Sequence, residues 1–283
     1  MFNLPKLQGQ EVPKNAEDII FFSCDYDYFD RHGYALAQSI VRTVGWLHVH
    51  CHVINEGNIN KVVLDDLVKQ YPFTYSYEDV SPTFYKDLDK NVKRMKEGRH
   101  IFKTDDLDYI ARRTYLASCR FMRLKELFDR ESQYVFQLDC DTILRNGFHQ
   151  NKFRDLAKDV RVMPKPKDPA VFIASALTLG LGETGVRFRK LFSDNMIEAF
   201  HKPIYWYVDQ DVLKNTMAQW KNTGNTYEHI PYTWNAWGQK RHDIFSTGKG
   251  DKKNDKRFKS AQLRWLPDHW QKPIRKELLD LPE

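Results

Sequence analysis

Short apolar segments alternate with amphipathic ones in the first third of the chain, and this alternation constrains the fold more than any other feature. Residues 18–24 form a continuous apolar run, which is typical of a strand buried on both faces. Helical spacing follows over residues 34–44, and residues 48–54 alternate polar and apolar side chains as a strand does. Residues 62–69 and 73–77 repeat the order of helix and strand. The alternation predicts βαβ units and therefore a mostly parallel sheet flanked by helices.

The later elements follow the same pattern less regularly. We expect a polar loop over 25–33, a short helix and loop over 81–108, an amphipathic helix over 115–128, a strand over 134–138, a strand pair or a strand and loop over 161–185, a helix over 186–200, a strand over 205–208 and a helix over 209–219. From residue 221 the chain is loop-rich, aromatic and then basic. We predict one domain over residues 1–260 and an extension over residues 261–283 that packs on the domain or at an interface.

Composition excludes several classes of protein. Hydrophobic residues make up 41% of the chain and charged residues 29%, which allows a substantial core and is unlike a disordered protein. No apolar run is long enough to cross a bilayer, and the first residues lack the pattern of a signal peptide. The four cysteines have no paired metal spacing, so we expect reduced thiols and a cytoplasmic location. The net charge of +6 suits an anionic ligand, but also nucleic acid or an acidic membrane surface.

Two aspartates, Asp139 and Asp141, directly follow the strand predicted over residues 134–138. In open α/β sheets, ligands bind at the carboxyl ends of strands. Carboxylates on a turn there can converge on one hard cation, and Mg²⁺ and Mn²⁺ prefer a few carboxylates plus phosphate oxygens. Such a cation stabilises the nucleoside diphosphate that leaves when a sugar–phosphate bond breaks. The alternative is a loop with two solvated or helix-capping aspartates, because the pattern is short.

A phosphatase of the haloacid-dehalogenase type is a second alternative for the same motif. In that class the first aspartate is the nucleophile, the motif lies near the start of the chain, and a threonine stands two places after the second aspartate. Here Thr142 follows at once and Ile143 occupies the expected threonine position. The spacing therefore favours a metal-binding motif over a phosphatase.

Several stretches together resemble GT-A-fold glycosyltransferases, especially the branch that contains glycogenin and bacterial lipopolysaccharide galactosyltransferases. They occur in the order of that family and are Ile20–Asp27, Ser118–Phe121 with Asp139–Asp141, Val208–Leu213, and Ile230–Asn235 with Ser246–Gly250. The resemblance implies a Rossmann-like GT-A fold, a nucleotide-sugar donor and a divalent metal held by Asp139 and Asp141. It also implies that the reaction retains the configuration of the sugar.

The resemblance assigns donor-binding residues in the first half of the chain. In the family the loop after the first strand holds the base and ribose, which implies Cys24, Asp25 and Tyr26 here. The helix arginine that precedes the D-x-D motif lies near the donor sugar and phosphate, which implies Arg120. These four residues are therefore expected in one donor site.

Further site residues come from the motif itself and from the second half of the chain. We place Asp139 and Cys140 at the donor phosphates. The family's Asp-Gln pair lies beside the reacting sugar, which implies Asp209 and Gln210, although Asp209 also suits the acidic first turn of a helix. Lys249 stands between two glycines that allow close backbone approach, and its ammonium could pair with the diphosphate.

The third metal ligand departs from the family pattern. The family supplies a histidine three residues before a late glycine, and counting back from Gly248 reaches Phe245, which cannot bind a metal. His242 is the candidate substitute, with Asp243 beside it. Without a third protein ligand, the metal would depend more on water and phosphate.

A glycine-rich segment supports a rival function. Residues Gly180–Gly185 match G-x-G-x-x-G, with an apolar stretch before and a helical stretch after, and Asp209 lies near the position of a ribose-binding acid. This pattern is that of a dinucleotide-dependent oxidoreductase. The segment follows a full set of βαβ elements instead of opening the domain, so a glycine-rich turn is the favoured interpretation.

Three further patterns leave alternatives open. An aromatic cluster predicts either an acceptor site or core packing, and its members are Tyr227, His229, Tyr232, Trp234 and Trp237. The alternating histidines His48, His50 and His52 could bind a metal, but a strand face packed beside the sheet edge is favoured. Residues 249–259 form a basic segment, which is typical of a solvated loop. The segment could instead contact an acidic acceptor, and nucleic acid is the least favoured partner. The extension could pair subunits into a homodimer or contact a membrane peripherally.

The sequence as a whole predicts a metal-dependent hexosyltransferase. It would use Mn²⁺ or Mg²⁺ to move a sugar from a nucleoside-diphosphate sugar, with a UDP-sugar favoured, to a glycan, a lipid-linked or a protein acceptor. We expect no nucleic acid partner. An inverting reaction would need a carboxylate base aimed at the acceptor hydroxyl, and the sequence leaves Asp209 open for that role.

Overall fold

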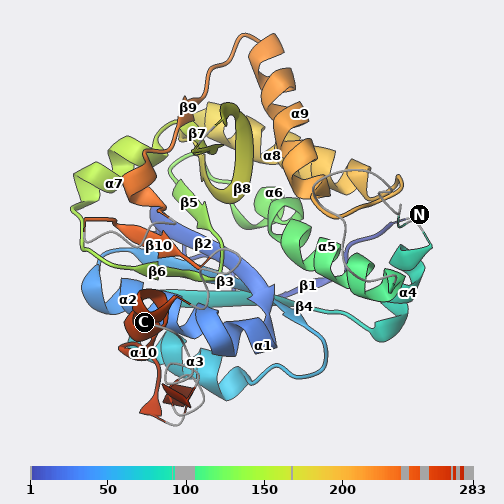
Figure 1. Cartoon of the computed structure of the whole chain (residues 1–283). Coiled ribbons are helices and arrows are strands. Elements are labelled where there is room, and N and C mark those ends of the chain that lie inside the picture. The colour runs from blue at the N-terminus through green and yellow to red at the C-terminus, as the bar shows by residue number, and fades with distance from the viewer. Residues whose placement is uncertain are drawn as a thin grey trace.

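The computed structural model describes residues 2–90, 92, 106–166, 168–236, 242–248, 255–268, 270–271 and 275–276. A central sheet runs through the molecule, and helices cover both of its faces (Figure 1). The strands of this sheet are β1 (Leu7–Gly9), β2 (Asp18–Asp25), β3 (His48–Asn55), β4 (Phe73–Asp79), β5 (Tyr134–Leu138), β7 (Val160–Lys165), β8 (Asp168–Leu179) and β9 (Glu228–His229). A separate small sheet pairs β6 (Thr142–Leu144) with β10 (Phe245–Thr247).

Most helices follow the predicted amphipathic segments. They are α1 (Tyr26–Tyr28), α2 (Tyr34–Thr43), α3 (Lys61–Gln70), α4 (Pro82–Asp89), α5 (Leu107–Met122), α6 (Leu124–Leu127), α7 (Gln150–Ala157), α8 (Gly182–Ala199), α9 (Val208–Asn222) and α10 (Lys256–Leu263), with a π-helical turn η1 (Phe29–Gly33) and a 3-10 turn η2 (Tyr232–Trp234). None of the helices in the described ranges is both long and apolar enough to cross a membrane.

The strand order places the carboxyl ends of β2 and β5 side by side. In the sheet the order is β1-β4-β3-β2-β5-β8-β7-β9, and β4, β3, β2 and β5 run parallel. The chain moves outward from β2 through β3 to β4, then returns through α5 to add β5 on the other side of β2. Ligands of open α/β sheets bind where the strand order reverses in this way. The D-x-D motif follows β5 and therefore lies at this point.

Each face of the sheet has its own core, because successive strand side chains point to opposite faces. Ile20 and Phe22 of β2 join a core with α2 and α3, whereas Ile19 and Phe21 join a second core with α5, α8 and α9. All four side chains are fully buried. The continuous apolar run over residues 18–24 thus reflects a strand covered on both sides, as the sequence predicted.

Three local predictions were wrong. Residues 26–33 are helical instead of a polar loop: Asp25 caps α1 by accepting the Tyr28 N–H, and η1 leads without a break into α2. The segment before α9 is a turn instead of a strand, because Tyr207 adopts a left-handed conformation with φ of 75°. The strand with alternating histidines, β3, is an inner strand between β2 and β4 and does not lie at the sheet edge.

The three histidines of β3 form a buried polar ladder with the neighbouring strand. Their rings share the hydroxyls of Thr74 and Ser76 at ring-nitrogen to oxygen distances of 2.8 to 3.0 Å. His52 continues the ladder to Glu78 at 3.4 Å. Hydroxyl partners, and not a shared metal ion, therefore account for the polar side chains on this strand.

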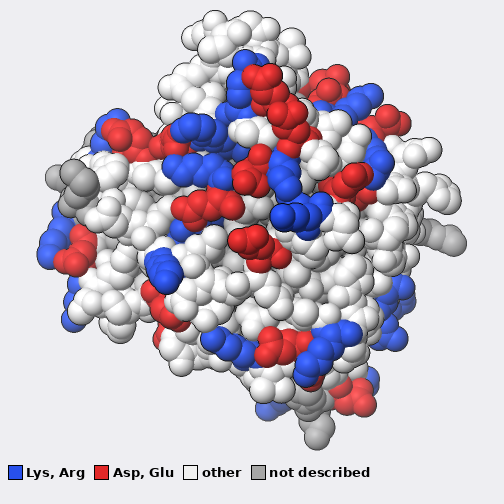
Figure 2. All heavy atoms as spheres, turned by 180° about the vertical axis from the view of Figure 1, so that it is seen from behind, with Lys and Arg blue, Asp and Glu red and all other residues white. Residues whose placement is uncertain are grey.

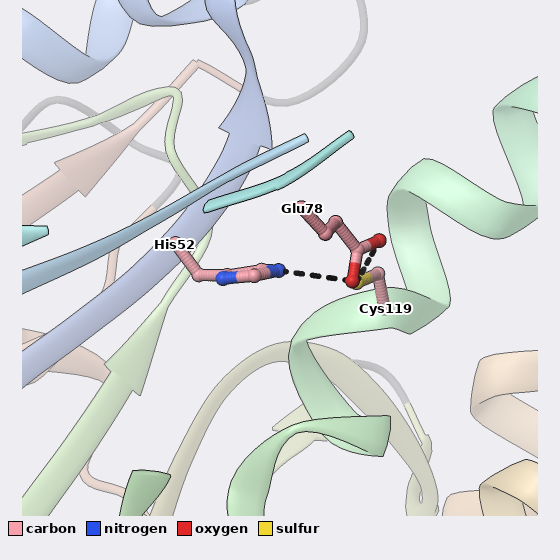
Figure 3. A group of neighbouring side chains, drawn as sticks. All are labelled: His52, Glu78 and Cys119. Carbon is pink, nitrogen blue, oxygen red and sulfur yellow. Dashed lines mark hydrogen bonds and ion pairs between the residues drawn. The ribbon is translucent and has the colours of Figure 1, made fainter. Parts of the chain in front are cut away.

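Glu78 ends the ladder in a buried cluster whose members come from β3, β4 and α5 (Figure 3). His52, Glu78 and Cys119 lie close enough together to suggest a metal site. However, the Arg123 guanidinium forms an ion pair with Glu78, and Tyr115 donates to the same carboxylate. Because all three side chains are fully buried, and the Glu78 carboxylate oxygens already have protein partners, we assign the cluster a structural role.

The ladder makes folding stability depend on pH. Burial lowers the pKa of His48 from 6.5 to about 4, and burial also lowers the pKa of His50. The unfolded chain then binds more protons than the folded one, so stability is complete above pH 6.5 and is lost as pH falls toward 4. From the pKa shift of His48 alone we expect the urea unfolding free energy to drop by about 2 kcal/mol between pH 7 and pH 5, and His50 adds to this drop. His48→Gln should reduce that drop, and an equal free energy at the two pH values would contradict the assignment.

The described part of the C-terminal extension packs on the main domain. Trp265 and Trp270 contact a small core beside α2 and α10, and the rings of Trp270 and Tyr34 lie 4.9 Å apart. The predicted boundary between residues 260 and 261 falls inside α10. Among the described residues on the rear face, Lys and Arg are interspersed with Asp and Glu instead of forming one basic stripe (Figure 2).

Candidate active site

A cavity of about 400 Å³ opens at the carboxyl ends of β2 and β5. It brings together eight of the site residues expected from the sequence, which are Cys24, Asp25, Arg120, Asp139, Cys140, Asp141, Asp209 and Gln210. Its other lining residues are Ser23, Tyr28, Arg113, Leu116, Ala117, Trp206 and Tyr207. Four separate segments of the chain therefore meet at the point where the strand order reverses.

The turn after β5 is held from two sides. The Asp139 N–H donates to the Ser175 carbonyl of β8 at 2.9 Å, which fixes the backbone where the strand ends. The Asp139 carboxylate forms an ion pair with Arg120, which also donates to the Ala174 carbonyl at 2.9 Å. Arg120 is 8% exposed, so this pair is largely shielded from water. The arrangement aims one carboxylate of the motif at the cavity with a fixed geometry.

Asp141, the second carboxylate of the motif, accepts a hydrogen bond from a residue that sequence reasoning missed. The Tyr28 hydroxyl donates to Asp141 Oδ2 at 3.0 Å. Burial, followed by the charge of Asp141, raises the pKa of Tyr28 well above its usual value, so the phenol remains a donor. The sequence did contain one signal for this position. Asp25 stands three residues before Tyr28 and caps a helix, which makes residues 26–28 helical.

A buried polar group supports the D-x-D turn from behind. Thr142 bonds to Thr247 at 3.0 Å, and Thr247 donates to the Asn235 side chain. The Gly248 N–H donates to the Asp141 carbonyl at 2.7 Å. The stretches Ile230–Asn235 and Ser246–Gly248, which were singled out by the family resemblance, thus reach the motif through β10.

The end of β2 contributes a third carboxylate and one thiol to the cavity, and the D-x-D turn contributes a second thiol. Burial raises the pKa of Asp25, while the Tyr28 backbone N–H and then Arg112 act in the opposite direction. Arg112 lies 3.4 Å from Asp25 and pairs more closely with Glu56. Burial also raises the pKa of the Cys24 and Cys140 thiols, which makes them poor nucleophiles. These cysteines therefore shape the wall and do not supply reactive groups.

Asp209 and Gln210 lie in the first turn of α9, opposite the D-x-D turn. Asp209 is 8% exposed, lines the cavity, and accepts the Gln210 N–H at 2.9 Å. The Tyr207 carbonyl accepts the N–H groups of Gln210 and Asp211. Asp209 thus has both features that the sequence allowed, an acidic position at a helix start and a place in the cavity.

Two of the expected site residues are not among the described lining of this cavity, and a third is not described by the structure. Tyr26 directly follows the lining residue Asp25 in the chain, but its side chain is 4% exposed and packs in the core with α2 and α3. His242 precedes β10 and is not among the described residues that line the cavity, whereas Asp141 meets the far end of β10 at Gly248. The assignment of His242 as a metal ligand stays a prediction. Lys249 lies outside the described residues, as does Trp237 of the aromatic cluster.

The glycine-rich segment lies at the opposite end of the sheet. β8 runs antiparallel to β5, so its carboxyl end at Gly180 lies beside the start of β5. A Cβ on Gly185 would approach the Gly180 carbonyl oxygen to 2.3 Å, and that carbonyl accepts from buried Arg189. The glycines thus allow β8 and α8 to pack closely. This position does not favour a dinucleotide site.

The aromatic cluster is divided between two places. Tyr227 and His229 pack with Phe172 near the β7–β9 edge of the sheet. Trp234 is 4% exposed and packs with Phe136 in the core. Tyr232 is exposed, and the described members do not line the cavity. Core and edge packing account for Tyr227, His229 and Trp234.

Tyr28 and Tyr26 provide a matched pair of variants. If Asp141 binds the metal as the sequence predicts, we expect Tyr28→Phe to raise the Mn²⁺ concentration needed for half-maximal nucleotide binding about tenfold, because the Tyr28 hydroxyl orients this carboxylate. Tyr26→Phe removes a hydroxyl that lies beside Asp30 and outside the cavity lining, and it should leave this concentration unchanged. Titration of Mn²⁺ at fixed UDP measures both. Equal effects of the two substitutions would contradict the role of Tyr28.

Comparisons of sequence and of structure give different results. No family model matches the sequence, and no curated protein matches it. Among solved structures, the galactosyltransferase LgtC in complex with donor and acceptor sugar analogs aligns over 92% of this chain and 99% of its own, with a TM-score of 0.52 and 16% identity. The bifunctional glycosyltransferase WbbM aligns over 94% of this chain with a TM-score of 0.57 and 13% identity. The chain covers 52% of the length of WbbM.

A third structure extends the pattern. The glycosyltransferase GlyE of Streptococcus pneumoniae TIGR4 aligns over 94% of this chain and 64% of its own, with a TM-score of 0.53 and 12% identity. At sequence identities this low, the structural alignments establish a shared fold and nothing beyond it. The resemblance predicted from the sequence motifs is confirmed at that level: the chain has the GT-A-type fold of glycosyltransferases, with a mostly parallel sheet between two layers of helices.

Proposed function

We propose that this protein is a metal-dependent glycosyltransferase that uses a nucleoside-diphosphate sugar. The observation that carries the proposal is the cavity in which Asp139, Asp141, Arg120, Asp209 and Gln210 converge at the strand-order reversal. The shared fold with glycosyltransferases supports it independently. Neither support depends on the other, because one rests on side chains and the other on the path of the backbone.

The motif offers ligands of the right chemistry for Mn²⁺ or Mg²⁺. Asp139 and Asp141 present hard carboxylate oxygens to the cavity, and the described lining contains no histidine. Such cations keep several waters and bind through one or two carboxylates together with substrate phosphates. The two aspartates would hold the metal, which when bound would neutralise the diphosphate leaving group. A third protein ligand is not required by this chemistry.

The chain's own residues divide the cavity between the parts of the donor. Asp25 and Cys24, at the end of β2, would lie beside the nucleoside. Arg120 supplies a fixed positive charge next to Asp139, where phosphate oxygens would gather. Asp209 and Gln210 face this point from α9 and would flank the sugar. We propose a UDP-sugar as donor, a glycan or glycan-bearing acceptor, and retention of configuration, in keeping with the motifs.

A panel of ligands tests the proposal by thermal unfolding. We expect UDP or GDP at about 100 times its dissociation constant to stabilise the protein by about 2.7 kcal/mol in the presence of Mn²⁺. This stabilisation corresponds to a melting-temperature increase of roughly 5 °C or more. EDTA should remove the increase. Stabilisation by NAD without metal would instead support the oxidoreductase, and duplex DNA binding with a steep salt dependence would support nucleic-acid binding.

A further inference from the structure

We infer that Arg113 and Trp206 form a subsite for a sugar that carries an anionic group, either a carboxylate or a phosphate. The inference rests on the proposed function and concerns the side of the same cavity away from Asp139. No expectation from the sequence motifs concerned either residue. The inference names the chemical class of substrate that this chain would select.

Arg113 differs from the other charged side chains of the cavity. Arg120 pairs with Asp139, and Asp25 pairs with Arg112. Arg113 lines the cavity and is half-buried, yet no residue in the described part of the chain forms a hydrogen bond or an ion pair with it. A guanidinium presents a planar set of donors that matches a carboxylate or phosphate with two parallel hydrogen bonds. Its fork is therefore available to a ligand.

Trp206 supplies an aromatic surface next to this guanidinium. The Arg113 Cζ lies 6.0 Å from the centre of the Trp206 ring, and both side chains line the cavity. The Trp206 and Tyr207 rings lie 5.2 Å apart with an interplanar angle of 66°. Trp206 is half-buried and lines the cavity, so its ring offers there a partly accessible apolar face together with a polar edge. A sugar ring stacked on that face would place a ring substituent within reach of the guanidinium.

The position of the pair separates it from the proposed metal site. Arg113 and Arg120 lie on one side of α5, two helical turns and so about 10 Å apart. Arg120 marks the Asp139 end of the cavity, and Arg113 marks the end next to the turn that precedes Asp209. Tyr207 holds this turn in a left-handed conformation, which is costly for a residue with a Cβ and occurs where the surroundings enforce it. The turn thus presents Trp206 beside the proposed sugar position.

The anionic group could belong to the acceptor or to the donor sugar, and two matched pairs of probes distinguish these sources. The acceptor pair is p-nitrophenyl β-glucuronide and p-nitrophenyl β-glucoside, titrated calorimetrically in the presence of Mn²⁺ and UDP. The donor pair is UDP-glucuronate and UDP-glucose, titrated with Mn²⁺ alone. We expect the wild-type protein to bind the anionic member of one pair at least about tenfold more tightly, as a charged hydrogen bond allows.

Substitutions test which side chain causes the tighter binding of the anionic probe. Arg113→Gln should reduce it to less than about twofold, and Arg113→Lys should retain part of it because the charge remains without the planar fork. Trp206→Ala should weaken both members of the pair by about fivefold and leave their ratio unchanged. Lys202→Gln, which makes the same charge change at an exposed position paired with Glu198, should keep the full preference.

The outcomes separate the two proposals. Wild-type protein that binds no UDP in the presence of Mn²⁺ would contradict the proposed function, and the subsite with it. Wild-type protein that binds UDP with Mn²⁺ but shows no preference in either pair would contradict the subsite alone. A preference that survives in Arg113→Gln would also overturn the assignment to Arg113.

Discussion

Replacing Asp141 by asparagine is expected to lower metal-dependent turnover of the donor by at least about 100-fold. The cavity offers two carboxylates that follow one strand, and the substitution removes half of this charge while keeping the size of the side chain. A metal supplies several kcal/mol of stabilisation to the charge that develops on the leaving group, and each 1.36 kcal/mol changes the rate about tenfold. The measurement is release of nucleoside diphosphate from the donor as a function of Mn²⁺ concentration.

Asp211→Asn is the matched control for this substitution. Asp211 lies in the first turn of α9, is exposed, and accepts a hydrogen bond from Tyr205 without lining the cavity. Turnover by this variant should remain within about threefold of wild type, since a surface substitution of this kind has a small effect. Asp141→Asn protein with an unaltered dependence on Mn²⁺ would show that the site is placed wrongly.

Replacing Glu78 by glutamine is expected to have the largest effect on stability. The substitution leaves the Arg123 guanidinium, whose side chain is 2% exposed, without its buried counter-charge. Breaking a buried pair by removing one partner costs about 3–5 kcal/mol of unfolding free energy. Equilibrium unfolding in urea at pH 7 measures the loss. A change below about 1 kcal/mol would contradict the importance of the pair.

The double substitution Glu78→Leu with Arg123→Leu separates the charge effect from packing. Removing both charges leaves no unpaired ion, so the double variant should be more stable than Glu78→Gln. Burial by itself would raise the pKa of Glu78, but the hydrogen bond and charge of His52, followed by Arg123, lower it to about 2. The stabilisation from this group is therefore present above pH 4.5 and is lost as pH falls toward 2.

Local sequence patterns were sufficient to predict the central strands. The apolar run of residues 18–24, the alternation over 48–54 and the strand before Asp139 are all strands in the structure. Each pattern follows from burial on one or both faces, which acts residue by residue and is visible in a single sequence. The position of the D-x-D motif after such a strand also made it a candidate ligand site before its neighbours were known.

Other features depend on how distant segments meet. Tyr28, and not Tyr26, reaches Asp141 because the unexpected helical turn after β2 sets which side chains face the cavity. Gly248 reaches Asp141 because β10 pairs with β6, although these two strands lie far apart in the sequence. The left-handed Tyr207 turns a predicted strand into the entry of α9. No local pattern specifies these pairings.

Arg113 shows the same limit for function. Arg113 lies on α5 but before the helix that the sequence predicted over residues 115–128, and its lack of an ion-pair partner among the described residues is a property of the assembled cavity. The motif comparison favoured Arg120 because a family pattern surrounds it. A residue that selects the substrate of one protein need not belong to such a pattern, and the structure is needed to find it.

The measurement that tests the central claim most directly is calorimetric titration of UDP into EDTA-treated protein, with and without added Mn²⁺. The claim is that Asp139 and Asp141 bind a nucleoside diphosphate through a divalent cation. It predicts binding with Mn²⁺ and at least about 100-fold weaker binding without it, with the difference abolished in Asp141→Asn. Equal affinity with and without metal, or a metal effect that persists in Asp141→Asn, would contradict it.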